Sequence, residues 1–140
     1  MNKWDKRFFE LAKLVASWSK DPSTQVGAVI VNDKNQVLSV GYNGFPRGIE
    51  DAPESYEDKE LKYSMVVHAE ENAILNSNSS LDNSTLYLYP LPCCTNCVSR
   101  ILQVGIKSVK ILVEEDKVND RDFSLTFKMF NDAGIRFEVH

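Results

Sequence analysis

One histidine, one glutamate and a cysteine pair have the types and spacing of a metal site. His68-Ala69-Glu70 is followed later in the chain by Pro92-Cys93-Cys94-Thr95-Asn96-Cys97. One imidazole and a Cys-x-x-Cys pair supply three ligands for a tetrahedral zinc ion and leave its fourth position to water, whereas structural zinc sites usually close all four positions with protein ligands. Glu70 is not needed as a ligand, so it can accept a proton from that water. The pattern predicts a catalytic zinc site.

The adjacent cysteines leave the identity of one ligand open. Either Cys93 or Cys94 could reach the ion, but the three-residue spacing from Cys97 favours Cys94 and makes Cys93 a small apolar neighbour. A redox Cys-x-x-Cys is one alternative, although it would not use His68 or Glu70. A non-catalytic zinc module is another, in which Cys93 would be a fourth ligand and Glu70 would have no role.

Alternating helices and strands must position these residues. Apolar periodicity and turn residues predict the following elements: helices at 4–19, 69–76, 95–104 and 122–132, and strands at 25–31, 36–42, 85–89, 108–113 and 135–139. The first two strands form a hairpin, and residues 43–65 form a long loop with a helical turn at 56–61. The order predicts an α/β fold with a mixed five-stranded sheet and helices on both faces.

The predicted elements place His68 at the start of one helix and Cys94 and Cys97 at the start of another. The N-terminal ends of helices carry a partial positive charge and free N–H groups, which lower the pKa of a thiol and stabilise its thiolate. Two such ends that converge on one point therefore suit a metal ion held by thiolates.

Composition limits the setting and the partners of the protein. With 140 residues and 43% hydrophobic content, the chain fits one domain spanning residues 1–140. No run of 18 apolar residues is present, and an odd number of cysteines favours metal chemistry in a reducing compartment, so we expect a cytoplasmic protein without a membrane partner. The net charge of −4 without a basic cluster argues against long nucleic acids but permits a mononucleotide.

The zinc motif resembles the signature of the cytidine and deoxycytidylate deaminase superfamily, His-x-Glu followed by Pro-Cys-x-x-Cys. Three further segments resemble the deoxycytidylate branch in particular: residues 19–28 (SKDPSTQVGA), 41–48 (GYNGFPRG) and 103–106 (QVGI). The likeness covers roughly residues 4–139. It implies a cytidine-deaminase-like three-layer α/β/α fold.

The resemblance also implies an activity, the hydrolytic deamination of dCMP to dUMP and ammonia. In that reaction a zinc-bound hydroxide attacks C4 of the base, and Glu70 shuttles the proton. Another small cytosine nucleoside or nucleotide is the alternative substrate. The zinc ligands carried over from the family are His68, Cys94 and Cys97.

For the substrate, the resemblance implies contacts of Asn43 with the sugar and positions near the nucleotide for Thr24, Arg47 and Ala69. Two of these residues have simpler explanations. Asn43 could be a turn residue chosen because asparagine tolerates a left-handed backbone, and Arg47 could be a solvated loop charge.

Related deaminases are commonly oligomeric, and the sequence points the same way. Two predicted helices carry many large apolar side chains, so we expect some of them at a subunit contact of a homo-oligomer. These side chains are Phe8, Phe9, Trp18, Phe123, Phe127, Met129 and Phe130. The alternative is that all of them pack in the core of one subunit.

Overall fold

A mixed five-stranded sheet organises the molecule, as the sequence predicts. The computed structural model describes residues 1–140 and contains strands β1 (Gly27–Val31), β2 (Val37–Tyr42), β3 (Thr85–Tyr89), β4 (Ser108–Ile111) and β5 (Arg136–Val139). Their order across the sheet is β2-β1-β3-β4-β5. β1 is antiparallel to both β2 and β3, whereas β4 is parallel to β3 and β5.

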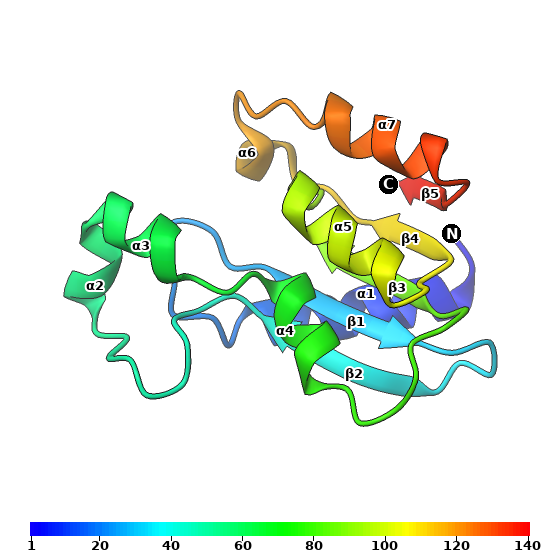
Figure 1. Cartoon of the computed structure of the whole chain (residues 1–140), viewed down its shortest axis with the longest axis horizontal. Coiled ribbons are helices and arrows are strands. Elements are labelled where there is room, and N and C mark those ends of the chain that lie inside the picture. The colour runs from blue at the N-terminus through cyan, green and yellow to red at the C-terminus, as the bar shows by residue number, and fades with distance from the viewer.

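Helices cover both faces of this sheet and make three layers (Figure 1). Helix α1 (Lys3–Ala16) lies on one face, and helices α4 (Ala69–Asn76), α5 (Thr95–Gln103) and α7 (Ser124–Asp132) lie on the other. Alternate residues of β1 enter opposite cores: Val29 packs with the side chains of α1, and Ala28 and Ile30 pack with those of α4 and α5. This alternation follows from the two-residue period of a strand. The three-layer α/β/α fold is confirmed.

Close packing fixes α4 against β2. A Cβ atom added to Gly41 of β2 would lie 2.3 Å from the Ala73 nitrogen and 2.4 Å from the Ala69 oxygen, so only glycine permits this approach. The hydroxyl of Ser39 also donates a hydrogen bond of 2.6 Å to the Ala73 carbonyl. The helix that begins directly after His68 is therefore held at one position on the sheet.

The segment between β2 and α4 differs from the prediction of a long loop with one helical turn at 56–61. It contains two short helices, α2 (Pro53–Glu57) and α3 (Lys59–Met65), which lie away from the sheet at one end of the molecule (Figure 1). The break falls at Asp58, whose carboxylate accepts a hydrogen bond of 3.1 Å from the Leu61 N–H and caps α3. The predicted turn therefore straddles the boundary between two helices.

Other element boundaries also shift. α1 ends at Ala16 and not at residue 19, because the N–H groups of Trp18 and Ser19 bond to carbonyls three residues earlier and not four. A one-turn helix, α6 (Glu115–Val118), was not predicted. Because it has four residues and buries none of them, it has no apolar period that a sequence could reveal. No helix combines the length and apolar character that are needed to span a membrane.

Most of the large apolar side chains expected at a subunit contact lie inside one subunit. Phe8, Phe9 and Phe130 are buried, and Phe127 and Met129 pack against the core. These residues pack inside one subunit because α1 and α7 cover opposite faces of the sheet, so each helix has its own core. A subunit contact stays a prediction for the remaining side chains. Two of the seven lie outside both cores: Trp18, which is 51% exposed, and Phe123.

Candidate functional site

The structure brings the three predicted zinc ligands together. His68 is the residue before α4, Cys94 is the residue before α5, and Cys97 lies in the first turn of α5. His68 Nδ1 lies 3.2 Å from Cys97 Sγ and 3.5 Å from Cys94 Sγ, and the two sulfurs are 3.5 Å apart. All three ligand atoms lie within 4.8 Å of one another. Two helix N-termini thus converge on one group of metal-binding atoms.

This geometry fits a tetrahedral zinc ion. Zinc bonds of about 2.3 Å to sulfur and about 2.0–2.1 Å to nitrogen require ligand atoms separated by roughly 3.5–3.8 Å. The observed separations of 3.2–3.5 Å lie within a few tenths of an ångström of that range. Nitrogen and sulfur donors are also the ligand types that zinc prefers over magnesium or calcium. The three residues can therefore hold zinc with little movement.

The pKa values of the three candidate ligands indicate a negatively charged sulfur that favours a cation. Hydrogen bonds from Cys97 and His68 lower the pKa of Cys94 to about 3, so this sulfur is a thiolate at neutral pH. The Cys94 thiolate in turn raises the pKa of His68 to about 9 and raises that of Cys97. The protons of His68 and Cys97 face the Cys94 thiolate, as a bound cation would. A metal ion would replace those protons on binding.

Glu70 lies in the first turn of α4, where it is 4% exposed and lines the same cleft as His68 and Cys94. Burial raises the pKa of Glu70, and the neighbouring His68 and Cys97 act in the opposite direction. A carboxyl group with a raised pKa can hold a proton at a pH where an ordinary glutamate releases it. Glu70 therefore has both the position and the proton affinity of a general acid and base.

Cys93 takes no part in this group of ligand atoms. It is 3% exposed and belongs to the apolar core that contains Cys97 and Phe130. Its carbonyl accepts a hydrogen bond of 2.8 Å from the Thr126 hydroxyl of α7. Burial raises the pKa of the Cys93 thiol well above its ordinary value, so the sulfur is protonated. The choice of Cys94 over Cys93 as the predicted ligand agrees with this geometry.

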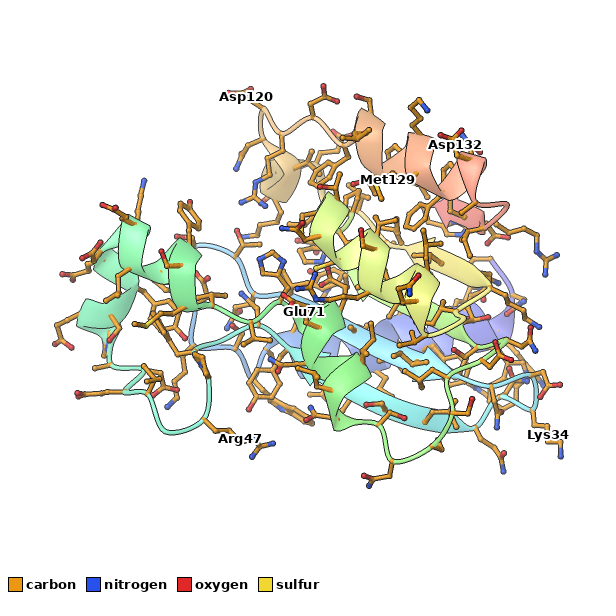
Figure 2. All side chains as sticks on the ribbon, viewed as in Figure 1. Lys34, Arg47, Glu71, Asp120, Met129 and Asp132 are labelled. Carbon is orange, nitrogen blue, oxygen red and sulfur yellow. The ribbon has the colours of Figure 1, made fainter.

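A cleft of about 250 Å³ opens beside the candidate ligands. Its wall includes Thr24, Asn43 and Ala69, three of the four residues expected near the substrate. Arg47, the fourth, lines a different hollow. Figure 2 shows its side chain pointing away from the molecule, which agrees with the alternative of a solvated loop charge.

Asn43 is held in place by both ends of its amide. Its Oδ1 accepts a hydrogen bond of 2.9 Å from the Val26 N–H, and its Nδ2 donates to the Thr24 carbonyl at 3.0 Å and to Asp21 Oδ2 at 3.4 Å. Its φ is not positive, in contrast to Asn35. The alternative of a left-handed turn residue is therefore wrong. One lone pair of Oδ1 remains free, because a carbonyl oxygen accepts two hydrogen bonds.

Four residues that the sequence analysis did not select complete the site. Glu71 accepts a hydrogen bond of 3.3 Å from the His68 N–H and pairs with Arg100 of α5 at 3.1 Å. Lys62 and Arg121 line the cleft and supply its two permanent positive charges. A glutamate three residues after a helix start is a detectable capping signal for Glu71. Nothing in the sequence positions of Lys62 and Arg121 distinguishes them from ordinary surface charges.

Comparisons with known proteins agree with this site. The family profile described as the cytidine and deoxycytidylate deaminase zinc-binding region matches residues 2–113. An uncharacterized deaminase of Aliivibrio fischeri, encoded in the luxG 3' region, is 42% identical over 96% of this chain and 92% of its own length. Human deoxycytidylate deaminase is 40% identical over 96% of this chain and 78% of its own.

A solved structure is also similar over the whole chain. The dCMP deaminase of cyanophage S-TIM5 in its apo form superposes with a TM-score of 0.75 at 26% identity and covers all of both chains. The same phage enzyme in complex with dCMP and dUMP has a TM-score of 0.72 at 24% identity. The fold, and not only the metal motif, is therefore shared with deaminases.

Proposed function

Because the chain belongs to the cytidine and deoxycytidylate deaminase family, we propose that it hydrolyses the 4-amino group of dCMP and releases dUMP and ammonia. One observation carries this proposal: the buried Glu70 lines one cleft with His68 and Cys94, which belong with Cys97 to the group of candidate metal ligands. The choice of dCMP over other cytosine compounds is supported by the relatives at about 40% identity that carry the name deoxycytidylate deaminase.

In the proposed reaction His68 Nδ1 and the sulfurs of Cys94 and Cys97 would hold the zinc ion. When bound, zinc would supply a hydroxide-like nucleophile for C4 of the base near neutral pH, because zinc lowers the pKa of water to about 7. A Glu70 carboxylate oxygen would accept one proton of the attacking water and deliver it to N3 of the base. Glu70 would then carry the second proton, from the hydroxyl now on C4, to the amino nitrogen, so that the C4–N bond breaks, ammonia leaves and C4=O forms. Burial raises the pKa of Glu70, which lets it keep the proton between the two transfers.

The cleft has walls suited to a pyrimidine. Several apolar residues contribute to its lining, namely Val26, Ala69, Leu91, Pro92 and Phe123. Such a lining excludes water from the reacting carbon and strengthens the interactions of the polar groups within it. The free lone pair of Asn43 Oδ1 would accept a hydrogen bond from the 3'-hydroxyl of the sugar. Because both Nδ2 hydrogens are already engaged, we assign Asn43 the role of acceptor.

Arg121 supports a substrate with a phosphate. It lines the cleft and makes no ion pair in the structure, whereas Lys62 is paired with Asp21. A guanidinium can donate two parallel hydrogen bonds to one phosphate. One free cation suits a monophosphate better than a triphosphate or a polynucleotide, so we propose that long nucleic acids are not substrates.

We also propose that the protein is cytoplasmic and forms a homo-oligomer. Three free cysteines are compatible with a reducing compartment. Several large apolar side chains remain uncovered, namely Leu14, Trp18, Tyr42 and Leu75, each more than two-fifths exposed. A second subunit is one way to cover them. Light scattering tests the assembly, because a mass near the 15.9 kDa of one chain would reject an oligomer.

A substrate panel tests the proposed activity. Zinc-loaded protein is incubated with cytidine, deoxycytidine, CMP, dCMP and dCTP, and the initial rate of ammonia release is measured for each. We expect the highest kcat/KM for dCMP. Preference for cytidine or deoxycytidine would assign the chain to nucleoside deamination, and no ammonia from any compound would reject the proposal.

A further inference from the structure

A buried ion pair joins α3 to the wall of the cleft. Lys62 of α3 is 8% exposed and Asp21 is 6% exposed. The Lys62 Nζ lies 2.9 Å from Asp21 Oδ2 and 3.0 Å from Asp21 Oδ1, so both carboxylate oxygens contact the ammonium group. Charged residues are rarely buried unless they are paired. The pair therefore links α3, which lies away from the sheet, to the segment before β1 (Figure 1).

Asp21 passes this constraint to residues of the proposed substrate site. Its Oδ1 accepts hydrogen bonds from the Ser23 N–H at 2.8 Å and the Thr24 N–H at 3.3 Å. Its Oδ2 accepts a hydrogen bond from Asn43 Nδ2 at 3.4 Å. One carboxylate thus fixes both the turn that carries Thr24 and one hydrogen of the Asn43 amide.

The orientation of the Asn43 amide depends on this arrangement. The Val26 N–H must face Oδ1, and the Thr24 carbonyl and the Asp21 carboxylate must face Nδ2. The free lone pair of Oδ1 consequently faces one direction only. An amide released from Asp21 could rotate or withdraw, and a displacement of about 1 Å in a substrate-positioning group can cost about 10²-fold in rate.

We propose that Lys62 is a positioning residue that acts through Asp21 to hold Asn43 and Thr24 in the geometry that binds the nucleotide sugar. The inference rests on the proposed function, because the sugar contact of Asn43 belongs to it. Lys62 itself does not contact the reacting atoms. Its charge prevents the Asp21 carboxylate from being buried without a partner, and an unpaired buried carboxylate would draw water or turn away from Asn43.

The test compares Lys62→Met with a matched control, Lys59→Met. Lys59 belongs to the same helix, is exposed and makes no ion pair. Lys62→Arg serves as the conservative variant because it keeps the charge and the hydrogen-bond donors. Each zinc-loaded protein is assayed with dCMP, deoxycytidine and 2',3'-dideoxycytidine monophosphate, which lacks the 3'-hydroxyl. Hydrogen exchange of the Val26 amide, which donates to Asn43 Oδ1, is measured on the same samples.

We expect Lys62→Met to lower kcat/KM for dCMP by about 10²-fold, mainly through KM, with a parallel loss for deoxycytidine. The ratio of kcat/KM for dCMP to that for the dideoxy compound should fall from its wild-type value towards one. The Val26 amide should exchange faster than in Lys59→Met, while Lys62→Arg should restore most of the kinetics and protection.

Two results would overturn the inference. In the first, Lys62→Met keeps the wild-type discrimination against the dideoxy compound and the wild-type protection of Val26. In the second, the loss is confined to dCMP and deoxycytidine is unaffected, which would make Lys62 a direct phosphate ligand. A wild-type protein without deaminase activity would reject the proposed function instead. The exchange of the Val26 amide would still decide whether Lys62 holds this network.

Discussion

Arg100 Nε lies 3.1 Å from Glu71 Oε2, so an ion pair joins α5 to α4 beside the candidate metal ligands. The other oxygen of Glu71 accepts the His68 N–H, and Arg100 also donates to the Asn96 carbonyl one residue before Cys97. Figure 2 shows Glu71 at the start of α4, facing α5. The pair therefore ties together the backbone on both sides of the metal site.

Replacing Glu71 by alanine should weaken zinc binding. Residues that orient metal ligands without contacting the metal typically change affinity by 10–100-fold when they are mutated. Competition with a chromophoric chelator measures the affinity. Glu10→Ala removes an exposed glutamate from α1 and is the control. Equal zinc affinity in the two variants would show that the ion pair does not position His68.

The two adjacent cysteines should differ in their effect on the metal. We expect one zinc per chain in the wild type and in Cys93→Ala, and no bound zinc in Cys94→Ser or Cys97→Ser. Cys93 packs in the core, so its variant loses packing but no ligand atom. Metal analysis after dialysis measures the content. A zinc-free Cys93→Ala together with a zinc-loaded Cys94→Ser would reverse the assignment.

Arg121 should contribute to recognition of the substrate's phosphate and not to the reaction at the base. In Arg121→Ala we expect kcat/KM for dCMP to fall about tenfold or more, as for the loss of a charge-assisted hydrogen bond, while the rate with deoxycytidine stays unchanged. Arg47→Ala, which removes an arginine outside the cleft, is the control. Equal losses for dCMP and deoxycytidine would remove Arg121 from phosphate recognition.

Asp5 should make the stability of the fold depend on acid. Burial alone would raise its pKa, but hydrogen bonds from Tyr87 at 2.7 Å and Lys110 at 2.9 Å outweigh burial and lower the pKa below the ordinary value of 3.8. A carboxyl group whose pKa is lower in the folded than in the unfolded state stabilises the fold at pH values above its unfolded-state pKa. That stabilisation is lost as the pH falls through the folded value.

Asp5→Asn should therefore lower the free energy of unfolding by about 2 kcal/mol at neutral pH, in the range for hydrogen bonds to a charged group. The difference from wild type should shrink as the pH falls below 3.8. Urea unfolding at a series of pH values measures both effects. Asp33→Asn, in the exposed hairpin connection, should show neither. A difference that is independent of pH would contradict the assigned role of Asp5.

The grouping of the candidate metal ligands was predictable from the sequence because these residues have rare types at a spacing set by two helix starts. His68, Cys94 and Cys97 meet as expected, and Glu70 lies beside them. The strands were also predictable from local pattern. β1, for example, is a continuous buried run between turn residues. Local pattern and tertiary structure agree at these positions.

The parts that were missed depend on contacts between distant residues. Lys62 pairs with Asp21 across 41 positions of sequence, and no local pattern encodes such a pair. Burial of a lysine cannot be read from α3, whose other lysine is exposed. The two helices α2 and α3 were missed because their polar residues are also common in loops. Asp58 follows the end of α2 and caps the start of α3, so no apolar period continues through both.

The most direct measurement of the central claim is the conversion of dCMP by wild-type protein and Glu70→Gln at equal zinc content. Glutamine keeps the size of the side chain but cannot accept the proton. The account predicts one dUMP and one ammonia per dCMP consumed by the wild type, and a kcat lowered by about 10²–10⁴-fold in the variant. Near-wild-type turnover by Glu70→Gln, or no dUMP from zinc-loaded wild-type protein, would contradict it.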